Sequence, residues 1–241
     1  MKIRNRQRLS NSGKTLRHKQ FRAARLSLRI ATALLVVLGF NCANSFFTRA
    51  VEPSATIRVR IVNYTEVTPD TIARAEREAG RIFHDAGLNV VWLDCPLRQS
   101  PVNPADPCQQ PLGPANIFVR LLSDQTRKGI QDSVFGFAVL PALASVYYRT
   151  AVDLARNYGA EIDIPTILGC VMVHEIGHLL LGSNSHSETG IMQGQWGRKQ
   201  VRELIKGDLL FTHQQSKLIR AEGQARMNLE EAELRAPSSR G

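Results

Sequence analysis

The residues whose types and spacing best suit chemistry lie between Cys170 and Met192, where the sequence reads CVMVHEIGHLLLGSNSHSETGIM. Its centre holds His174, Glu175 and His178 in the order H-E-x-x-H. On a helix, side chains four residues apart lie on one face with Cβ atoms about 5–6 Å apart, so both imidazoles can reach one zinc ion at about 2.0–2.1 Å. The glutamate projects about 100° round the helix from the first histidine, where it can act as a general base toward a water that the metal activates.

The segment that carries this trio is predicted to form a buried helix. The helix begins at Asp163 or Ile164, with Pro165 in its first turn, and Gly182 ends it in a left-handed conformation. Apolar residues occupy most of its sides, so it belongs in the interior. A lone buried histidine is ordinarily a hydrogen-bonded core residue, but the ordered trio arises by chance in roughly one chain in a hundred of this length. Three polar side chains in an apolar helix are costly without a partner, and one catalytic Zn²⁺ is the partner that we expect.

The helix provides two ligands, whereas a catalytic zinc takes three and keeps one position open. His186 is the nearest remaining imidazole, just beyond the glycine that ends the helix. The alternative third ligand is a glutamate from a later segment, with Glu203 favoured over Glu188. Cys170 lies one turn before His174 and is expected to pack as a small buried apolar side chain rather than to bind metal.

From the first histidine of the motif to Met192, the sequence resembles the metzincin clan of zinc peptidases. The clan's pattern is H-E-x-x-H-x-x-G-x-x-H followed by a methionine-containing turn. Its glycine and third histidine fall at positions 181 and 184, where this chain has Leu181 and Asn184, and Gly182 and His186 are displaced from them. The resemblance implies that His186 is the third ligand and Met192 the methionine of the turn. A gluzincin-type site with a glutamate ligand, and Met192 as an ordinary core residue, remain open.

The same resemblance implies a fold, a substrate and an activity. The implied fold is a mixed five-stranded sheet with an antiparallel edge strand, a backing helix, the zinc-binding helix and a C-terminal helix. Gly136, Phe137 and Ala138 would lie on the edge strand and pair with an extended peptide or protein substrate. The implied activity is endopeptidase hydrolysis with Glu175 as the catalytic base. The alternatives are a hydrolase of other amides and a non-catalytic exported zinc-binding module, which would need no general base.

The order of elements between residues 56 and 234 also predicts an α+β fold of α/β-like character. Residues 56–62 alternate in the manner of a strand, and Thr68 and Pro69 then open a helix that Gly87 ends before a second strand at 88–93. Such a unit joins two parallel strands right-handedly. A glycine and a following proline mark 133–139 as an edge strand. The other predicted elements are strands at 115–122 and 144–148 and helices at 151–158 and 212–234, with 204–210 ambiguous.

The excess positive charge of the chain lies in its first 50 residues. They contain 11 Lys/Arg and no Asp/Glu, whereas residues 51–241 contain 20 Lys/Arg against 21 Asp/Glu. The folded part therefore has no bulk charge that would favour a nucleic-acid partner. The basic segment precedes an apolar run at 30–40 that is too short to span a bilayer, and residues 43–45 resemble a cleavage site.

These features predict the domain organisation and the location. We expect a signal peptide at 1–45, or an N-terminal membrane anchor if it stays uncleaved, then a linker at 46–55, a catalytic domain at 56–234 and a tail at 235–241. The expected location is the periplasm or the extracellular space. Exported proteins meet oxidising conditions, and Cys95 and Cys108 bracket a proline-rich loop. We expect a disulfide between them, with two free thiols as the alternative.

Overall fold

The computed structural model describes residues 55–97, 103–124, 135–158, 163–182 and 184–236. All of them belong to one compact unit, Pro53–Gly241. The predicted leader and residues 46–54 of the predicted linker lie outside the described residues, as do residues 237–241 of the predicted tail.

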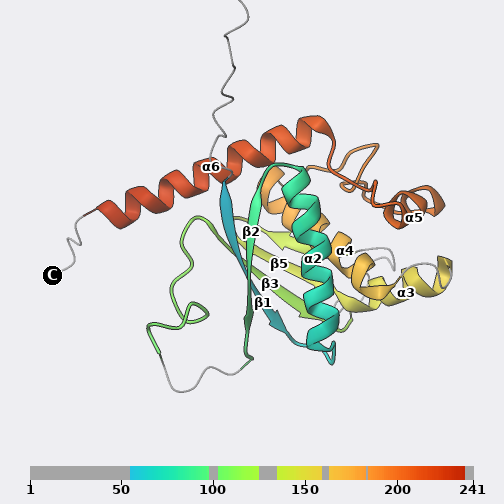
Figure 1. The fold of residues 1–241 in the computed structure, drawn as a ribbon, viewed down its shortest axis with the longest axis horizontal. Helices are drawn as coiled ribbons and strands as arrows, with labels where there is room; N and C mark the ends of the chain where they lie inside the picture. The colour runs from blue at the N-terminus through green and yellow to red at the C-terminus, as the bar shows by residue number, and fades with distance from the viewer. Residues whose placement is uncertain (1–54, 98–102, 125–134, 159–162, 183, 237–241) are drawn as a thin grey trace, which may run out of the picture. The chain divides into compact units, whose positions relative to one another are not determined.

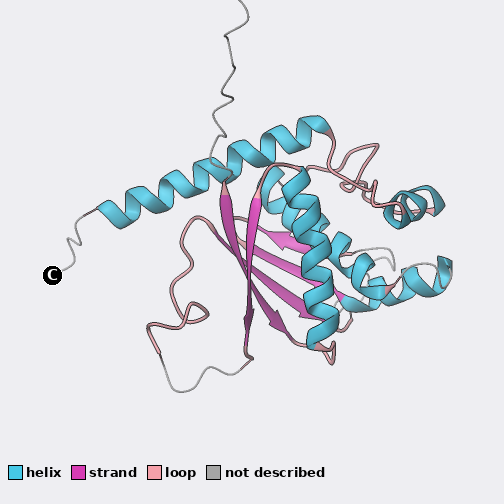
Figure 2. Ribbon diagram, in the orientation of Figure 1, coloured by secondary structure: helices cyan, strands magenta, loops and turns pink. Residues whose placement is uncertain are grey.

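One mixed sheet of five strands forms the centre of the fold, in the order β2-β1-β3-β5-β4 (Figures 1 and 2). Neighbouring strands are parallel except for β4 and β5, which pair antiparallel at the edge. The predicted α+β class with its mixed sheet and antiparallel edge strand is therefore confirmed. The strands are β1 (Thr56–Asn63), β2 (Asn89–Cys95), β3 (Asn116–Leu122), β4 (Gly136–Val139) and β5 (Leu143–Tyr147). The helices are α2 (Pro69–Asp85), α3 (Tyr148–Tyr158), α4 (Ile164–Leu181), α5 (Arg198–Ile205) and α6 (His213–Arg235).

The core lies on one face of this sheet. In β1 the alternation of side chains buries Ile57, Val59 and Ile61 while Arg58 is exposed, because successive residues of a strand point to opposite faces. Helix α2 packs against α4 over the buried face. Helix α4 also contacts α3, α5, α6 and the strands β4 and β5, so it is the central element of the packing.

Local signals set the ends of α2 as expected. The Thr68 hydroxyl accepts a hydrogen bond from the Thr71 N–H, and Pro69 occupies the first helical position. At the other end, Gly87 adopts a φ of 82° just after the capping residue, a conformation that costs glycine little. The predicted βαβ unit is confirmed, because β1 and β2 pair in parallel on either side of this helix in the sequence.

Three expectations need correction. The edge strand predicted at 133–139 begins at Gly136, and residues 133–134 lie outside the described residues. Tyr148, expected in the fifth strand, is instead the first residue of α3. Helix α5 was not predicted, because it is short and follows the cap residue Gly197, which has no side chain to cap it; the cap comes from inside the helix, where Gln200 Oε1 accepts the Gly197 N–H at 2.9 Å.

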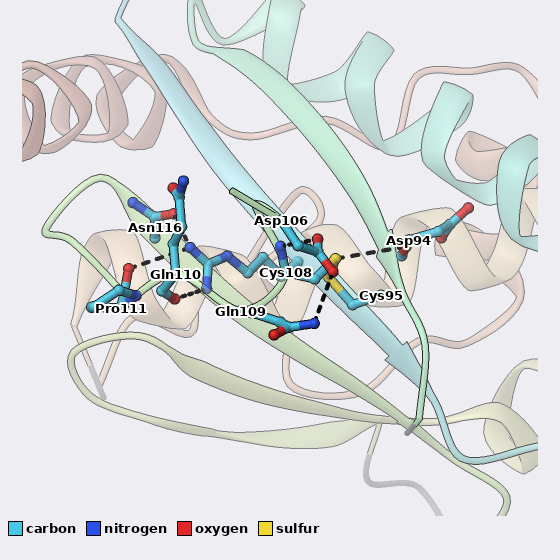
Figure 3. Close-up of a disulfide and its surroundings, with 9 residues drawn as sticks. Asp94, Cys95, Asp106, Cys108, Gln109, Gln110, Pro111 and Asn116 are labelled. Carbon is cyan, nitrogen blue, oxygen red and sulfur yellow. Dashed lines mark hydrogen bonds between the residues drawn. A yellow bond between two sulfur atoms is a disulfide. The ribbon is translucent and has the colours of Figure 1, made fainter. Parts of the chain in front are cut away.

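The outer face of the sheet is covered in part by the loop that follows β2. The predicted disulfide between Cys95 and Cys108 is present and closes this loop (Figure 3). The buried Arg60 of β1 donates hydrogen bonds to the Gln110 carbonyl oxygen at 2.5 Å and to Asn116 Oδ1 at 3.3 Å. The covalent link and the buried guanidinium together hold the loop against β1 and β3.

Among the described residues, α4 is the one helix long and apolar enough to cross a membrane. However, 83% of its apolar window is buried inside the protein. Its composition therefore reflects its place at the centre of the packing, where it contacts the sheet and the other helices.

We predict that replacing both Cys95 and Cys108 by serine lowers the free energy of unfolding by about 3 kcal/mol, because a crosslink over so short a loop restricts the unfolded chain by about that amount. The bridge spans a sequence separation of 13 residues. Urea denaturation monitored by circular dichroism measures the change. A reductant should shift the wild type toward the double variant and leave that variant unchanged. An unchanged midpoint in the double variant would contradict the prediction.

Candidate metal centre

Helix α4 positions the polar trio inside an apolar element. It begins after the cap residue Asp163, which makes no side-chain capping bond, and Pro165 lies in its first turn. His174 is 2% exposed and Glu175 is 3% exposed. Gly182 ends the helix with φ 96° and ψ 166°. The positive φ was expected, but this ψ is outside the left-handed helical region and belongs to a region that is essentially reserved for glycine.

The structure brings three imidazoles together at this helix. His174 Nε2 and His178 Nε2 lie 3.2 Å apart, close to the separation of about 3.3 Å that two nitrogens have when both bind a tetrahedral zinc. His186 joins them from the loop after α4, and the three candidate ligand nitrogens lie within 4.8 Å of one another. His186 is the exposed member of the group. The residues present therefore fit a three-histidine zinc site.

The alternative glutamate ligands do not join this group. Among the described residues, the groups able to hold a metal contain the three histidines and no carboxylate. Glu203 lies on α5 and forms an ion pair with Lys199 at 3.8 Å. Glu188 is an exposed residue of the loop. Cys170 is buried and free, as expected for a core residue, and burial raises the pKa of its thiol.

A hydrogen bond at the far ring nitrogen sets the tautomer of His174. Its Nδ1 donates to the Ile191 carbonyl oxygen at 2.8 Å, and a carbonyl can only accept, so Nε2 carries the lone pair. His178 Nδ1 lies 2.9 Å from Ser185 Oγ, a hydroxyl that can accept or donate. When Ser185 accepts, the Nε2 atom of His178 carries a lone pair as well. Such partners orient metal-binding histidines and increase their basicity as ligands.

Burial keeps these two rings neutral. It lowers the pKa of His174 to about 3, although the bond to Ile191 acts in the opposite direction. Burial, together with the neighbouring His186, lowers the pKa of His178 to about 4. Metal binding requires unprotonated imidazole. Both helical ligands are therefore in the binding form at neutral pH.

Glu175 lies beside the three histidines. It lines a cleft of about 230 Å³ together with the three imidazoles, Gly194 and the β4 residues Gly136, Phe137 and Ala138. In the metal-free protein, burial raises the pKa of its carboxyl group to about 8. A Cβ at Gly136 would lie 2.9 Å from Glu175 Cγ and 2.0 Å from the Ser145 carbonyl oxygen. The edge strand thus approaches the glutamate as closely as only glycine permits.

The turn at Gly190–Met192 lies beneath the metal-binding part of the helix. Met192 is fully buried, and its sulfur lies 2.5 Å from where a Cβ on Gly177 would stand. Ile191 anchors the turn, because its N–H donates to the Leu210 carbonyl oxygen at 2.9 Å while its own carbonyl accepts from His174. Met192 therefore packs against the helix that carries the histidines, and an ordinary core role accounts for this contact.

Several site residues were missed in the sequence. Phe135 and Trp196 contact the ring of His174, with centroids 5.0 Å and 6.0 Å away. Gly194 supports His186, since a Cβ there would lie 3.1 Å from its Nδ1. None of these residues has a distinctive spacing from the motif. The presence of Gly194 shortly after Met192 was the one signal in the sequence, and it does not indicate that this glycine packs against His186.

Comparisons with known proteins give weak similarities. No protein-family model matches the chain, and no curated protein matches it. Among solved structures, it is similar to an archaemetzincin from Methanopyrus kandleri, with 15% identity, 72% of this chain and 98% of that chain covered, and a TM-score of 0.45. It is also similar to a zinc-dependent peptidase from Methanocorpusculum labreanum, with 16% identity, 67% and 99% covered, and a TM-score of 0.44. Both TM-scores are low.

We predict that the protein binds zinc and that His178→Ala weakens the affinity for zinc by about 100-fold or more. Loss of a residue that only orients a metal ligand costs about 10–100-fold in affinity, and loss of the ligand itself should cost more. Competition with a chromophoric chelator measures the dissociation constant. His84→Ala, which alters an exposed histidine at the end of α2, is the control and should bind as the wild type does. Equal affinity in the His178 and His84 variants would contradict the site.

We also predict a pH-dependent gain of stability in metal-free Glu175→Gln. The folded pKa of Glu175, about 8, lies above its ordinary value of 4.5. Preferential protonation of this group in the folded state stabilises the wild type fully below pH 4.5, and this stabilisation is lost as the pH rises to about 8. In this window the free energy of unfolding of the variant should rise relative to wild type by up to about 1.4 kcal/mol per pH unit.

Denaturant midpoints of both metal-free proteins between pH 5 and 8.5 measure this difference. Glu188→Gln makes the same change on an exposed side chain and is the control. A constant difference between wild type and Glu175→Gln across the range would show that Glu175 does not titrate there.

Proposed function

We propose that this chain is an exported zinc-dependent endopeptidase. The observation that carries the proposal is the placement of Glu175, a buried carboxyl group with no hydrogen-bond partner among the described residues, beside three histidines and on the wall of an open cleft. A structural zinc site needs no such group and closes its fourth position with a protein ligand. Three imidazoles leave that position for water.

The roles of the protein's own residues follow from this placement. His174, His178 and His186 would hold one Zn²⁺, which supplies Lewis acidity toward a water molecule and a substrate carbonyl. Glu175 takes the proton of the attacking water and then delivers it to the leaving amine. Burial among apolar side chains strengthens this carboxylate as a base, because the environment disfavours its charged form.

The edge strand β4 supports a peptide as the substrate. Its one sheet neighbour is β5, and Gly136, Phe137 and Ala138 line the same cleft as Glu175. An extended peptide can add to such an edge through main-chain hydrogen bonds. A strand added there would bring its backbone carbonyls past the histidines. This arrangement favours cleavage within a chain, since an extended segment can continue beyond the cleft on both sides.

Export is proposed from the N-terminal sequence and the disulfide. The basic segment and the apolar run at 30–40 have the order of a signal peptide, and the Cys95–Cys108 bridge suits an oxidising compartment. Cellular fractionation of the tagged full chain, followed by N-terminal sequencing of the mature form, tests this part. Recovery of the uncut chain in the cytoplasm would overturn it.

We predict that zinc-loaded wild type hydrolyses casein and mixed peptides. Glu175→Gln should keep its zinc but lower kcat/KM by about 10²–10⁴-fold, because general base catalysis contributes about that much. Mass spectrometry of the products identifies internal cleavage. Glu188→Gln is the control. A zinc-loaded wild type that cuts nothing, or a fully active Glu175→Gln, would overturn the proposal in favour of a non-catalytic zinc module.

A further inference from the structure

A second cavity adjoins the metal centre. It has a volume of about 260 Å³, and Phe135 lines both it and the cleft that contains the histidines. Trp196 forms part of its wall, with its ring centroid 4.4 Å from that of Phe135. Both rings also contact the ring of His174. We call this cavity the side pocket. The rings of Phe135 and Trp196 separate it from His174.

The opposite wall of the side pocket is one face of α3. Thr150, Asp153, Leu154, Asn157 and Tyr158 line it, and their spacing of three, one, three and one residues places them on a single helical stripe. Four of these five side chains are polar. Asp153 is the charged residue among the described residues that line the pocket. The α3 wall thus offers a carboxylate and several other hydrogen-bond acceptors to a side chain bound in the same cavity as the aromatic rings.

The aromatic wall of the side pocket is itself well packed. Trp196 is 7% exposed and its ring packs against that of Phe135. A cavity that joins such a fixed aromatic wall to a polar helix face is typical of a binding site.

We propose that the side pocket receives the side chain of the substrate residue that flanks the scissile bond, and that Asp153 selects arginine or lysine there. This inference rests on the proposed peptidase function. The long apolar stem of either residue can lie against Phe135 and Trp196, whose ring faces attract a cation. The charged end then reaches Asp153 and the amide oxygen of Asn157. An aliphatic side chain would form no bond with Asp153 or Asn157, whereas a cation would form charge-assisted hydrogen bonds with the carboxylate.

Existing ion pairs of Asp153 do not prevent this contact. Arg149 and Arg156 lie 3.1 Å and 3.8 Å from its carboxylate, but their side chains are 58% and 68% exposed. Exposed pairs of this kind contribute only about 0–1 kcal/mol. A substrate cation held on the aromatic wall can therefore replace them, and the two arginines return to solvent.

The test compares cleavage of a peptide library by zinc-loaded wild type, Asp153→Asn and Asp85→Asn. Asp85 is a close match for Asp153, because it pairs with an arginine four residues earlier at 2.9 Å and has a side chain 43% exposed, against 46% for Asp153. Mass spectrometry reports the residues on both sides of each cut. We expect arginine or lysine to be enriched on one side in the wild type. The ratio of kcat/KM for matched arginine and leucine peptides should fall about tenfold or more in Asp153→Asn and stay constant in Asp85→Asn.

A binding measurement separates this inference from the proposed function. Calorimetric titration of the same arginine and leucine peptides into zinc-loaded Glu175→Gln, with and without Asp153→Asn, requires no hydrolysis. If the wild type cuts peptides with no basic preference, or Asp153→Asn keeps that preference, the side-pocket assignment is overturned and the peptidase function stands. If the wild type cuts nothing but the arginine peptide binds about tenfold tighter through Asp153, the function fails and the pocket stands. Absence of both cleavage and selective binding overturns both.

Discussion

The structure depends on burying two ionisable side chains, His174 and Glu175, in the middle of an apolar helix. Isolated polar groups in such surroundings are costly, so the elements around α4 must provide partners for them. The sheet, α2 and α6 all contact this helix, and the carbonyl of Ile191 accepts from His174. In the part of the chain that the structure describes, Nε2 of His174 has only another imidazole, that of His178, beside it. A cation bound between these rings would complete the compensation.

The segment from His178 to His186 is two residues longer than in the metzincin pattern, and the backbone on either side of the loop shows how the chain accommodates them. Gly182 turns the backbone into a region that other residues essentially do not enter, and the extra residues of the loop follow it. The loop is then fixed again at Ile191, which bonds to Leu210 on one side and to His174 on the other. Its two ends are held while the segment between them carries His186 to the helix. The irregularity lies where a loop can absorb it without moving either anchor.

Much of this was predictable from the sequence because the signals are local. The cap at Thr68, the stop at Gly87 and the alternation of β1 each depend on neighbours within a few residues, and the histidine pair depends on helical spacing alone. The contributions of Phe135 and Trp196 were not predictable, since they reach His174 from segments on either side of it in the chain and have no fixed spacing from it. Helix α5 escaped notice for a related reason: its cap comes from its own Gln200 rather than from a residue before it.

The edge strand β4 lines the cleft that contains Glu175 and the three histidines. A free edge strand invites unwanted pairing, and proteins limit this risk by keeping such strands short. Strand β4 has four residues, and its first, Gly136, fits between the Ser145 carbonyl and the Glu175 side chain with no room for a Cβ. The same glycine that lets the strand lie against Glu175 thus also weakens the strand itself, because glycine contributes no side-chain packing to a sheet. A pairing surface that is short, interrupted by glycine and adjacent to the proposed metal centre suits brief binding of an extended chain better than permanent association.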